Sequence, residues 1–199
     1  MTKTIIGIDY SLSCPAICVH KGKEFSWSNC TVYYLTSVKK YEGDYLKDYI
    51  KQPLYDNDGL KGYINGRLHL PYTSQTERHD QISNWAISVI PNSYANIFLE
   101  GYSYGSKGLV FNLAENMGIL KYKFYRTKHK FEVVVPGVVK KIATGKGNAD
   151  KLKMYEQFVK DTKIDLMKVF EQTKLNNPVT DIVDAFYVAK AGYESIKSK

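Results

Sequence analysis

The sequence of 199 residues has few of the side chains on which several kinds of site depend. It contains 3 Cys, 4 His and 2 Trp, and only 3 of its 28 basic residues are Arg. Three cysteines cannot all pair, so nothing indicates a disulfide framework or an oxidising compartment. Cys14 and Cys18 with four scattered histidines make a poor zinc site, and we predict buried free thiols instead.

Long hydrophobic runs are also absent. No segment approaches the ~18 consecutive apolar residues that a membrane-spanning helix needs. The apolar run near the N-terminus is too short for a secretory signal and contains Asp9. We therefore expect a cytoplasmic protein without a membrane partner.

Basic charge is abundant and localised. The chain has 28 Lys and Arg against 20 Asp and Glu, which gives a net charge of +8. Residues 102–164 hold 13 of the basic and 5 of the acidic residues, so this stretch carries the whole excess. Such a distribution favours a surface that faces a polyanion, and some of the 17 Tyr could stack on nucleic-acid bases.

The order of short apolar runs predicts strands first and then alternating strands and helices. We expect an antiparallel meander within residues 4–35, buried strands at 95–99 and 131–135, and helices over about 74–90, 109–125, 149–163 and 179–196. Ser74 and Glu77 have the spacing of a capping box at the start of the first helix. Residues 37–72 show weak periodicity and form an insertion with little predictable structure. This order indicates an α/β domain.

Four carboxylates occupy positions where a charge needs a partner. Asp9 and Glu100 each follow directly on an apolar strand, where a solvated strand end would be an adequate explanation for either one alone. Asp181 and Asp184 are three apart, hence on one face of a predicted helix, where like charges repel unless a cation lies between them. The helix dipole is an alternative explanation, and it suits Asp181 better than Asp184. Together the four would suit hard divalent cations.

A basic segment, residues 136–153, contains the turn Gly145-Lys146-Gly147, followed by Asn148 as the predicted N-cap of the next helix. Five lysines surround this turn: Lys140, Lys141, Lys146, Lys151 and Lys153. Backbone amides at the helix start and these ammonium groups could hold phosphates, although a solvated Lys-rich turn explains the segment equally well. The P-loop pattern is absent.

In this order the motifs resemble the RuvC-type Holliday junction resolvases of the ribonuclease H-like superfamily. The matching blocks are collinear: Ile6-Gly7-Ile8-Asp9, Phe98-Leu99-Glu100, Glu115-Asn116-Met117-Gly118, Val139-Lys140-Lys141 with TGKGNADK at 144–151, and Asp181-Ile182-Val183-Asp184-Ala185. The resemblance implies an α/β, ribonuclease H-like fold, in which helices flank a mixed five-stranded sheet made of an antiparallel meander and then parallel strands. It also implies a single domain, residues 1–199, with an insertion at about 37–80.

The resemblance further implies a magnesium-dependent endonuclease that resolves four-way DNA junctions, as a homodimer, by paired symmetric nicks. Two Mg²⁺ ions, or Mn²⁺ in their place, would be held by Asp9, Glu100, Asp181 and Asp184, and a metal-activated water would hydrolyse the phosphodiester. Lys140 and Lys151 map onto two lysines near the scissile phosphate, and the predicted DNA-binding residues are Tyr102, Tyr104, Lys107, Lys140, Lys141, Lys146 and Lys151. The helix over 109–125 would form the dimer, although its apolar stripe could equally be core.

The sequence also departs from the bacterial pattern. Tyr10-Ser11 replaces the usual Pro-Gly after Asp9, and Ser103 stands where a Phe normally helps to open the junction. These differences suggest a divergent phage or viral branch, acting in the host cytoplasm. They leave open a broader branched-DNA, flap or packaging-associated nuclease of the same fold, and a non-catalytic junction-binding protein. His79 and His129 are expected to be exposed polar residues without a role.

Overall fold

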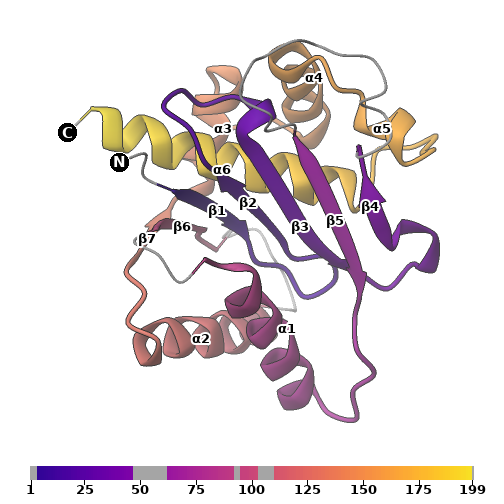
Figure 1. Ribbon diagram of the computed structural model, residues 1–199, viewed down its shortest axis with the longest axis vertical. Helices are drawn as coiled ribbons and strands as arrows, with labels where there is room; N and C mark the ends of the chain where they lie inside the picture. Colours follow the sequence, from indigo (N-terminus) through magenta and orange to yellow (C-terminus); the bar gives the residue numbers. More distant parts are fainter. Residues whose placement is uncertain (1–3, 47–61, 92–94, 103–109, 199) are drawn as a thin grey trace.

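A mixed sheet forms the centre of the protein (Figure 1), in a computed structural model that describes residues 4–46, 62–91, 95–102 and 110–198. Within these residues the sheet has seven strands: β1 (Ile5–Asp9), β2 (Ala16–His20), β3 (Cys30–Thr36), β4 (Gly43–Tyr45), β5 (Tyr63–Leu68), β6 (Asn96–Glu100) and β7 (Phe131–Val134). They lie in the order β4-β5-β3-β2-β1-β6-β7.

Five of these strands have the predicted arrangement. β1, β2 and β3 form an antiparallel meander. β6 pairs in parallel with β1, and β7 pairs in parallel with β6. The α/β fold class is therefore confirmed. The expected number of five strands is wrong, because β4 and β5 extend the sheet beyond β3.

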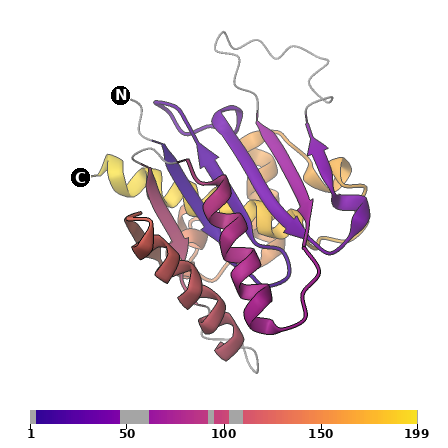
Figure 2. The same cartoon turned by 60° about the horizontal axis from the view of Figure 1, so that its bottom comes forward.

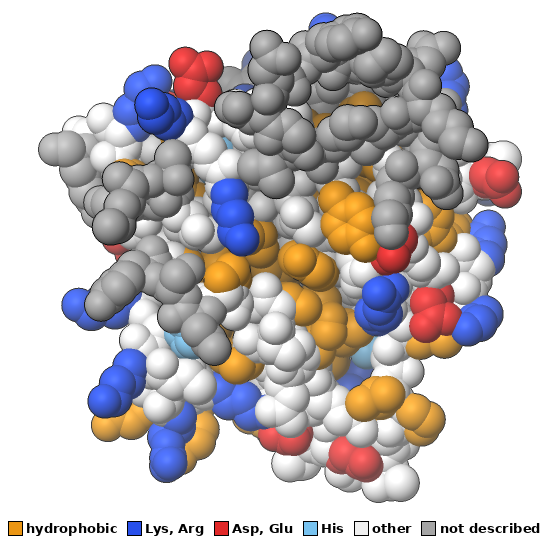
Figure 3. Space-filling model, viewed as in Figure 1, with side chains coloured by type: hydrophobic (Ala, Val, Ile, Leu, Met, Phe, Trp, Pro, Cys, Tyr) orange, Lys and Arg blue, Asp and Glu red, His pale blue; other side chains and the backbone are white. Residues whose placement is uncertain are grey.

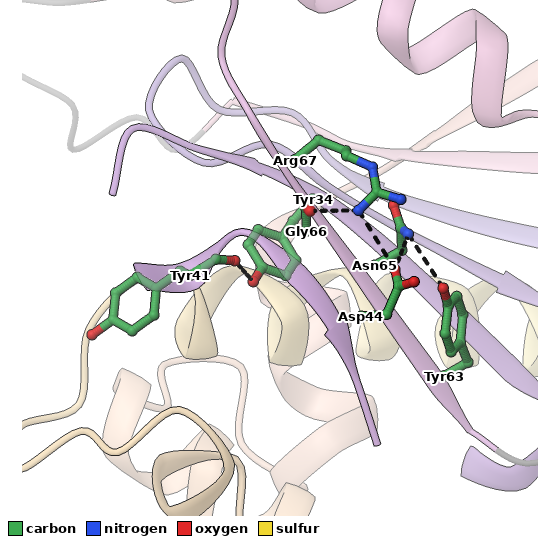
Figure 4. A network of polar contacts seen from close by, with 7 residues as sticks. All are labelled: Tyr34, Tyr41, Asp44, Tyr63, Asn65, Gly66 and Arg67. Atoms are coloured by element: carbon green, nitrogen blue, oxygen red, sulfur yellow. Dashed lines mark hydrogen bonds and ion pairs between the residues drawn. The ribbon is translucent and has the colours of Figure 1, made fainter. Parts of the chain in front are cut away.

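The two additional strands come from the stretch that has weak periodicity in the sequence. β5 runs parallel to β3, and β4 pairs antiparallel with β5 at the edge of the sheet. Figure 4 shows the polar network on this hairpin, in which the Asp44 carboxylate accepts hydrogen bonds from Asn65 and from Arg67. Polar side chains and glycine dominate these strands, so their pairing leaves little apolar alternation to recognise.

Helices cover both faces of the sheet. Their bounds are α1 (Gln75–Val89), α2 (Val110–Arg126), α3 (Pro136–Thr144), α4 (Lys151–Thr162), α5 (Leu166–Val169) and α6 (Val179–Lys197), with short 3₁₀ turns at Trp27–Asn29 and Lys39–Tyr41. Figures 1 and 2 show α1 and α2 on one face, and α3, α4 and α6 on the other. Two hydrophobic clusters fill these layers, one on each side of the sheet.

Local signals in the sequence explain several helix ends. The Ser74 side chain accepts a hydrogen bond from the Glu77 backbone amide, as the capping-box spacing predicts. The sequence predicts Asn148 as the N-cap of the helix that follows the turn, but the residue that caps α4 is Asp150, whose side chain accepts a hydrogen bond from the Lys153 amide. The segment before it also contains α3, which Pro136 opens and Gly145 ends in a left-handed conformation with φ of 77°.

The central helix α6 lies very close to β1. A Cβ atom placed on Gly7 would lie 2.1 Å from the Ala189 backbone nitrogen and 2.5 Å from the Ala185 carbonyl oxygen. Glycine is therefore required at this position, two residues before Asp9. This close contact is what brings the N-terminal turns of α6 to the end of β1.

The three cysteines are buried and free, as predicted. The expectation that His79 is exposed is wrong, because this residue of α1 is only 2% exposed. Its place on the buried face of α1, three residues before Ile82, accounts for this. No helix within the described ranges is long and apolar enough to cross a membrane.

Candidate active site

The first two acidic residues lie side by side at the end of adjacent parallel strands. Asp9 is the last residue of β1 and Glu100 the last residue of β6, and Ile8 pairs with Leu99 directly before them. Side chains alternate along a strand, so residues two apart lie on the same face of the sheet. Asp9 therefore lies on the same face as Gly7, and Glu100 lies on the same face as Phe98, which is the face that α6 covers. Both carboxylates are therefore directed toward the helix layer that contains α6.

The other two acidic residues lie in the first turns of α6. Asp181 is 4% exposed, and one of its carboxylate oxygens lies 3.0 Å from the Thr180 hydroxyl, which donates to it. Asp184, one turn further along, is partly exposed. The structure thus brings the two strand-end acids and the helix pair to one end of the β1–α6 contact.

A cavity of about 280 Å³ opens at this end of the sheet. Asp9, Glu100 and Asp184 line it together with Lys140 of α3 and Lys151 of α4. Asp181 is not among the lining residues, since it lies buried behind them. Three predicted acids and both predicted lysines therefore share one cavity, and the fourth acid is adjacent.

The carboxylates strongly perturb one another. Burial, and then the charges of Glu100, Asp181 and Asp184, raise the pKa of Asp9 well above its usual range.

The other three acids shift in the same direction. Burial first, and then the charge of Asp184, raises the pKa of Glu100 to about 8, although Lys140 and Lys151 oppose the shift. Burial likewise raises the pKa of Asp181 to about 7 and that of Asp184 to about 6, with Lys151 as the main opposing charge. Four carboxylates at such values are energetically costly without positive charge, so the site favours a cation.

The donor set fits hard divalent metal ions in its chemistry. Carboxylate oxygens are the ligands that Mg²⁺ and Mn²⁺ prefer, and a cation would reverse the pKa shifts just described. Across the described residues, no three His, Cys, Asp or Glu are already arranged so that they could hold a metal ion. The carboxylates are neighbours, and side-chain adjustment on binding would have to complete their coordination.

The remaining predicted residues divide into three groups. Tyr102 lines the cavity, and the Lys121 ammonium lies 5.5 Å from the centre of its ring. Lys141 and Lys146 are exposed on α3 and on the turn after it, outside the cavity lining. Tyr104 and Lys107 lie outside the described residues.

Several lining residues are not among the predicted site residues. They are Tyr10, Ser11, Gly101, Val110, Leu113, Met117, Pro136, Val139 and Met154. Tyr10 and Ser11 could have been found from their position directly after Asp9. Leu113 and Met117 belong to the predicted apolar stripe of α2. Some residues of such a stripe line a cavity and others pack in the core, and the local sequence is the same for both.

Comparison with solved structures identifies proteins of similar fold. The structure is similar to Thermus thermophilus RuvC, with 14% identity and a TM-score of 0.53 over 98% of this chain and 96% of that one. It is also similar to T. thermophilus RuvC in complex with a Holliday junction substrate, with 13% identity and a TM-score of 0.54 over 98% and 97% of the two chains. No family profile and no curated protein matches the sequence. The fold is that of the RuvC-type resolvases.

Proposed function

We propose that this chain, which has the RuvC-type resolvase fold, is a metal-dependent DNA endonuclease that resolves four-way junctions. The observation that carries the proposal is the shared cavity of Asp9, Glu100, Asp184, Lys140 and Lys151. Clustered acids with raised pKa values beside two lysines are typical of a phosphoryl-transfer site rather than of a structural ion pair.

Each group has a distinct role in this proposal. Asp9, Glu100, Asp181 and Asp184 would hold two Mg²⁺ ions, which Mn²⁺ could replace. When bound, such ions supply an activated water and stabilise the leaving oxygen. The ammonium groups of Lys140 and Lys151 would contact the scissile phosphate and offset the negative charge of the transition state.

DNA would bind over the cavity and the basic surface beside it. Lys141 is exposed on α3 and Lys146 on the turn after it. From these positions they would bind phosphates of the DNA backbone rather than the phosphate that reacts. Tyr102 at the cavity offers a ring on which a base could stack. The solved T. thermophilus RuvC complex contains a Holliday junction, and we extend that substrate to this chain.

Paired nicks on a four-way junction require two active sites, so we propose a homodimer. One face of α2 presents Phe111, Gly118, Tyr122 and Tyr125 at helical spacing, with Phe111 82% and Tyr125 76% exposed. Apart from the neighbouring backbone of α2 itself, no atom of the described residues lies within 4 Å of a Cβ placed on Gly118, so a second helix could approach closely there. Figure 3 shows hydrophobic and basic side chains intermingled around α2.

Cleavage of a synthetic immobile four-way junction with Mg²⁺ tests the function. We expect paired symmetric nicks from the wild type, while Asp9→Asn abolishes cleavage and leaves junction binding in EDTA intact. Parallel reactions with a Y-fork and a linear duplex test the broader branched-DNA and packaging alternatives, which predict comparable cleavage of those substrates. Binding without cleavage at any Mg²⁺ or Mn²⁺ concentration would instead favour the non-catalytic alternative.

A further inference from the structure

The connection between β1 and β2 begins at Asp9 and is held in place by side chains from distant parts of the chain. This connection, residues 10–15, will be called the Asp9 loop. Tyr10 and Ser11 of the loop line the cavity. Within the loop, the Ser11 hydroxyl accepts a hydrogen bond of 3.1 Å from the Cys14 amide. Most of its other anchors come from residues that no active-site motif includes.

The first anchor comes from α1. The Arg78 guanidinium donates a hydrogen bond of 2.8 Å from Nη2 to the Leu12 carbonyl oxygen. Arg78 is itself held by the ring of Tyr72, whose centre lies 5.1 Å from the guanidinium carbon. A charged donor on a backbone carbonyl makes one of the stronger hydrogen bonds available to a loop.

The second anchor comes from the segment directly after β5. His69 Nε2 lies 3.0 Å from the Ser13 carbonyl oxygen, and since a carbonyl only accepts, Nε2 carries the hydrogen. The His69 backbone amide donates to the Thr36 carbonyl at the end of β3, which fixes the residue relative to the sheet. Burial lowers the pKa of His69, which keeps the ring neutral at neutral pH.

The loop is also connected to the helix that carries the acidic pair. Asn177 Nδ2 lies 3.5 Å from the Ser13 hydroxyl, just before α6 begins. The Thr180 hydroxyl lies 2.8 Å from Asn177 Oδ1 and 3.0 Å from Asp181 Oδ2, so one hydroxyl hydrogen serves both acceptors. A continuous series of contacts therefore joins the Asp9 loop to Asp181.

We propose that His69 and Arg78 are positioning residues that hold the Asp9 loop and thereby set the spacing between Asp9 and Asp181. The inference rests on the proposed function, because it concerns ligands of that metal site. It gives a role to the β5–α1 connection, which Figure 1 shows passing beneath the sheet on its way from β5 to α1. Both anchors donate to backbone carbonyls, so they constrain the loop whatever its side chains are.

The test measures Mn²⁺ binding to the full-length, DNA-free protein by electron paramagnetic resonance. His69→Ala and Arg78→Ala should each weaken Mn²⁺ binding by about 10-fold, the lower end of the 10–100-fold typical of residues that orient metal ligands. The Mg²⁺ concentration for half-maximal cleavage should rise by a similar factor, while junction affinity in EDTA stays the same. His69→Gln retains an N–H donor near Nε2 and should restore most of the affinity.

Arg67→Ala is the matched control. Arg67 comes from the same stretch of chain, but it donates to the Gly66 carbonyl and pairs with Asp44, as Figure 4 shows, and its side chain makes no hydrogen bond to the Asp9 loop among the described residues. Its loss should leave Mn²⁺ binding unchanged. Hydrogen exchange of a peptide that covers residues 10–15 gives a second readout, and it should accelerate in Arg78→Ala and not in Arg67→Ala.

Two negative outcomes can be told apart. If Asp9→Asn abolishes Mn²⁺ binding but His69→Ala and Arg78→Ala bind it like the wild type, the positioning role is wrong and the proposed function stands. If the wild type binds no Mn²⁺, or Asp9→Asn binds it equally well, the metal site and the positioning role both fail. Should an alanine variant not fold, Arg78→Lys and His69→Gln carry the comparison, and a 10-fold weakening in His69→Gln would contradict the proposal.

Discussion

Two acidic environments lie along α6, one at its N-terminus and one near its middle. Near the N-terminus, Asp181 and Asp184 have raised pKa values, because burial outweighs the opposing charge of Lys151. Near the middle, Asp161 of α4 accepts hydrogen bonds from Lys190 at 2.7 Å and from Tyr187 at 3.1 Å. Burial alone would raise the pKa of Asp161 too, but its hydrogen bonds, foremost that from Lys190, lower it below the usual value.

The comparison shows that the protein itself supplies partners for the Asp161 carboxylate, whereas it compensates the negative charge of the cavity acids only in part. Asp161 has a partner for each oxygen, because Gln157 donates to the other one at 2.7 Å. The cavity acids have each other as near neighbours, and their lysines only partly compensate. Such an arrangement lowers stability without metal, which is the usual compromise at a functional site.

The largest effect is expected at the N-terminal end of α6. Asp184→Asn should reduce junction cleavage by more than about 100-fold, since a metal ligand should matter more than the residues that orient it. The same change removes a repelling charge, so the metal-free variant should melt at a higher temperature than the wild type. Cleavage rates and thermal melts in EDTA measure both. A variant that is inactive and also less stable would mean that Asp184 is a structural residue.

The next largest effect concerns the lysines that compensate these acids. Lys140→Met should lower the cleavage rate by about 10²–10³-fold, as the loss of one group that stabilises transition-state charge commonly does. Lys146→Met is the matched control, because Lys146 is exposed and outside the cavity lining. It should weaken DNA binding mildly and reduce the salt dependence of binding by about one counterion. If Lys140→Met and Lys146→Met lowered the cleavage rate equally, the proposed role of Lys140 at the scissile phosphate would be wrong.

The pH dependence of stability should reveal the cavity acids directly. Their folded pKa values, about 8 in the case of Glu100, exceed those of the unfolded chain, so the folded protein binds more protons between about pH 4 and pH 8. Stability without metal should therefore rise as the pH falls through that window. Asp161 has a lowered pKa, so it stabilises the folded protein at pH values above its unfolded pKa. This stabilisation is lost only as the pH falls below about 4.

Thermal melts in EDTA at pH 5.5 and pH 8.5 test this expectation. The melting temperature should be several degrees higher at pH 5.5, given roughly 2–4 °C per kcal/mol for a chain of this size. Asp184→Asn should reduce the difference, and Mg²⁺ should stabilise the wild type most at pH 8.5. A melting temperature that falls as the pH is lowered from 8.5 to 5.5 would contradict the raised pKa values.

The smallest effect is expected at Lys190, near the middle of α6. Lys190→Ala removes the ammonium group from Asp161 and should cost about 1 kcal/mol, because the pair is only partly exposed and Tyr187 and Gln157 remain as donors. Denaturant unfolding measures the loss. Cleavage should not change, and a fall in activity would show that this part of α6 is coupled to the site.

Local patterns were sufficient for much of the fold. The capping box at Ser74 and the apolar run before Asp9 each predict an element from neighbouring residues alone, and the structure contains both. The β4–β5 hairpin could not be predicted in this way. Its strands depend on pairing with β3 and on the Asp44 network, contacts between residues far apart in the chain. The burial of His79 likewise depends on how α1 packs in the tertiary structure.

The sequence by itself determined which chemical groups are present and their order: four acids, the localised basic excess and the two lysines eleven residues apart. Only the tertiary structure decided which of them meet. The parallel register of β1 and β6 places Asp9 beside Glu100, and the close contact at Gly7 brings α6 to them. Asp181 lies behind the cavity and Lys146 outside it, because side-chain proximity depends on long-range packing that no local pattern encodes.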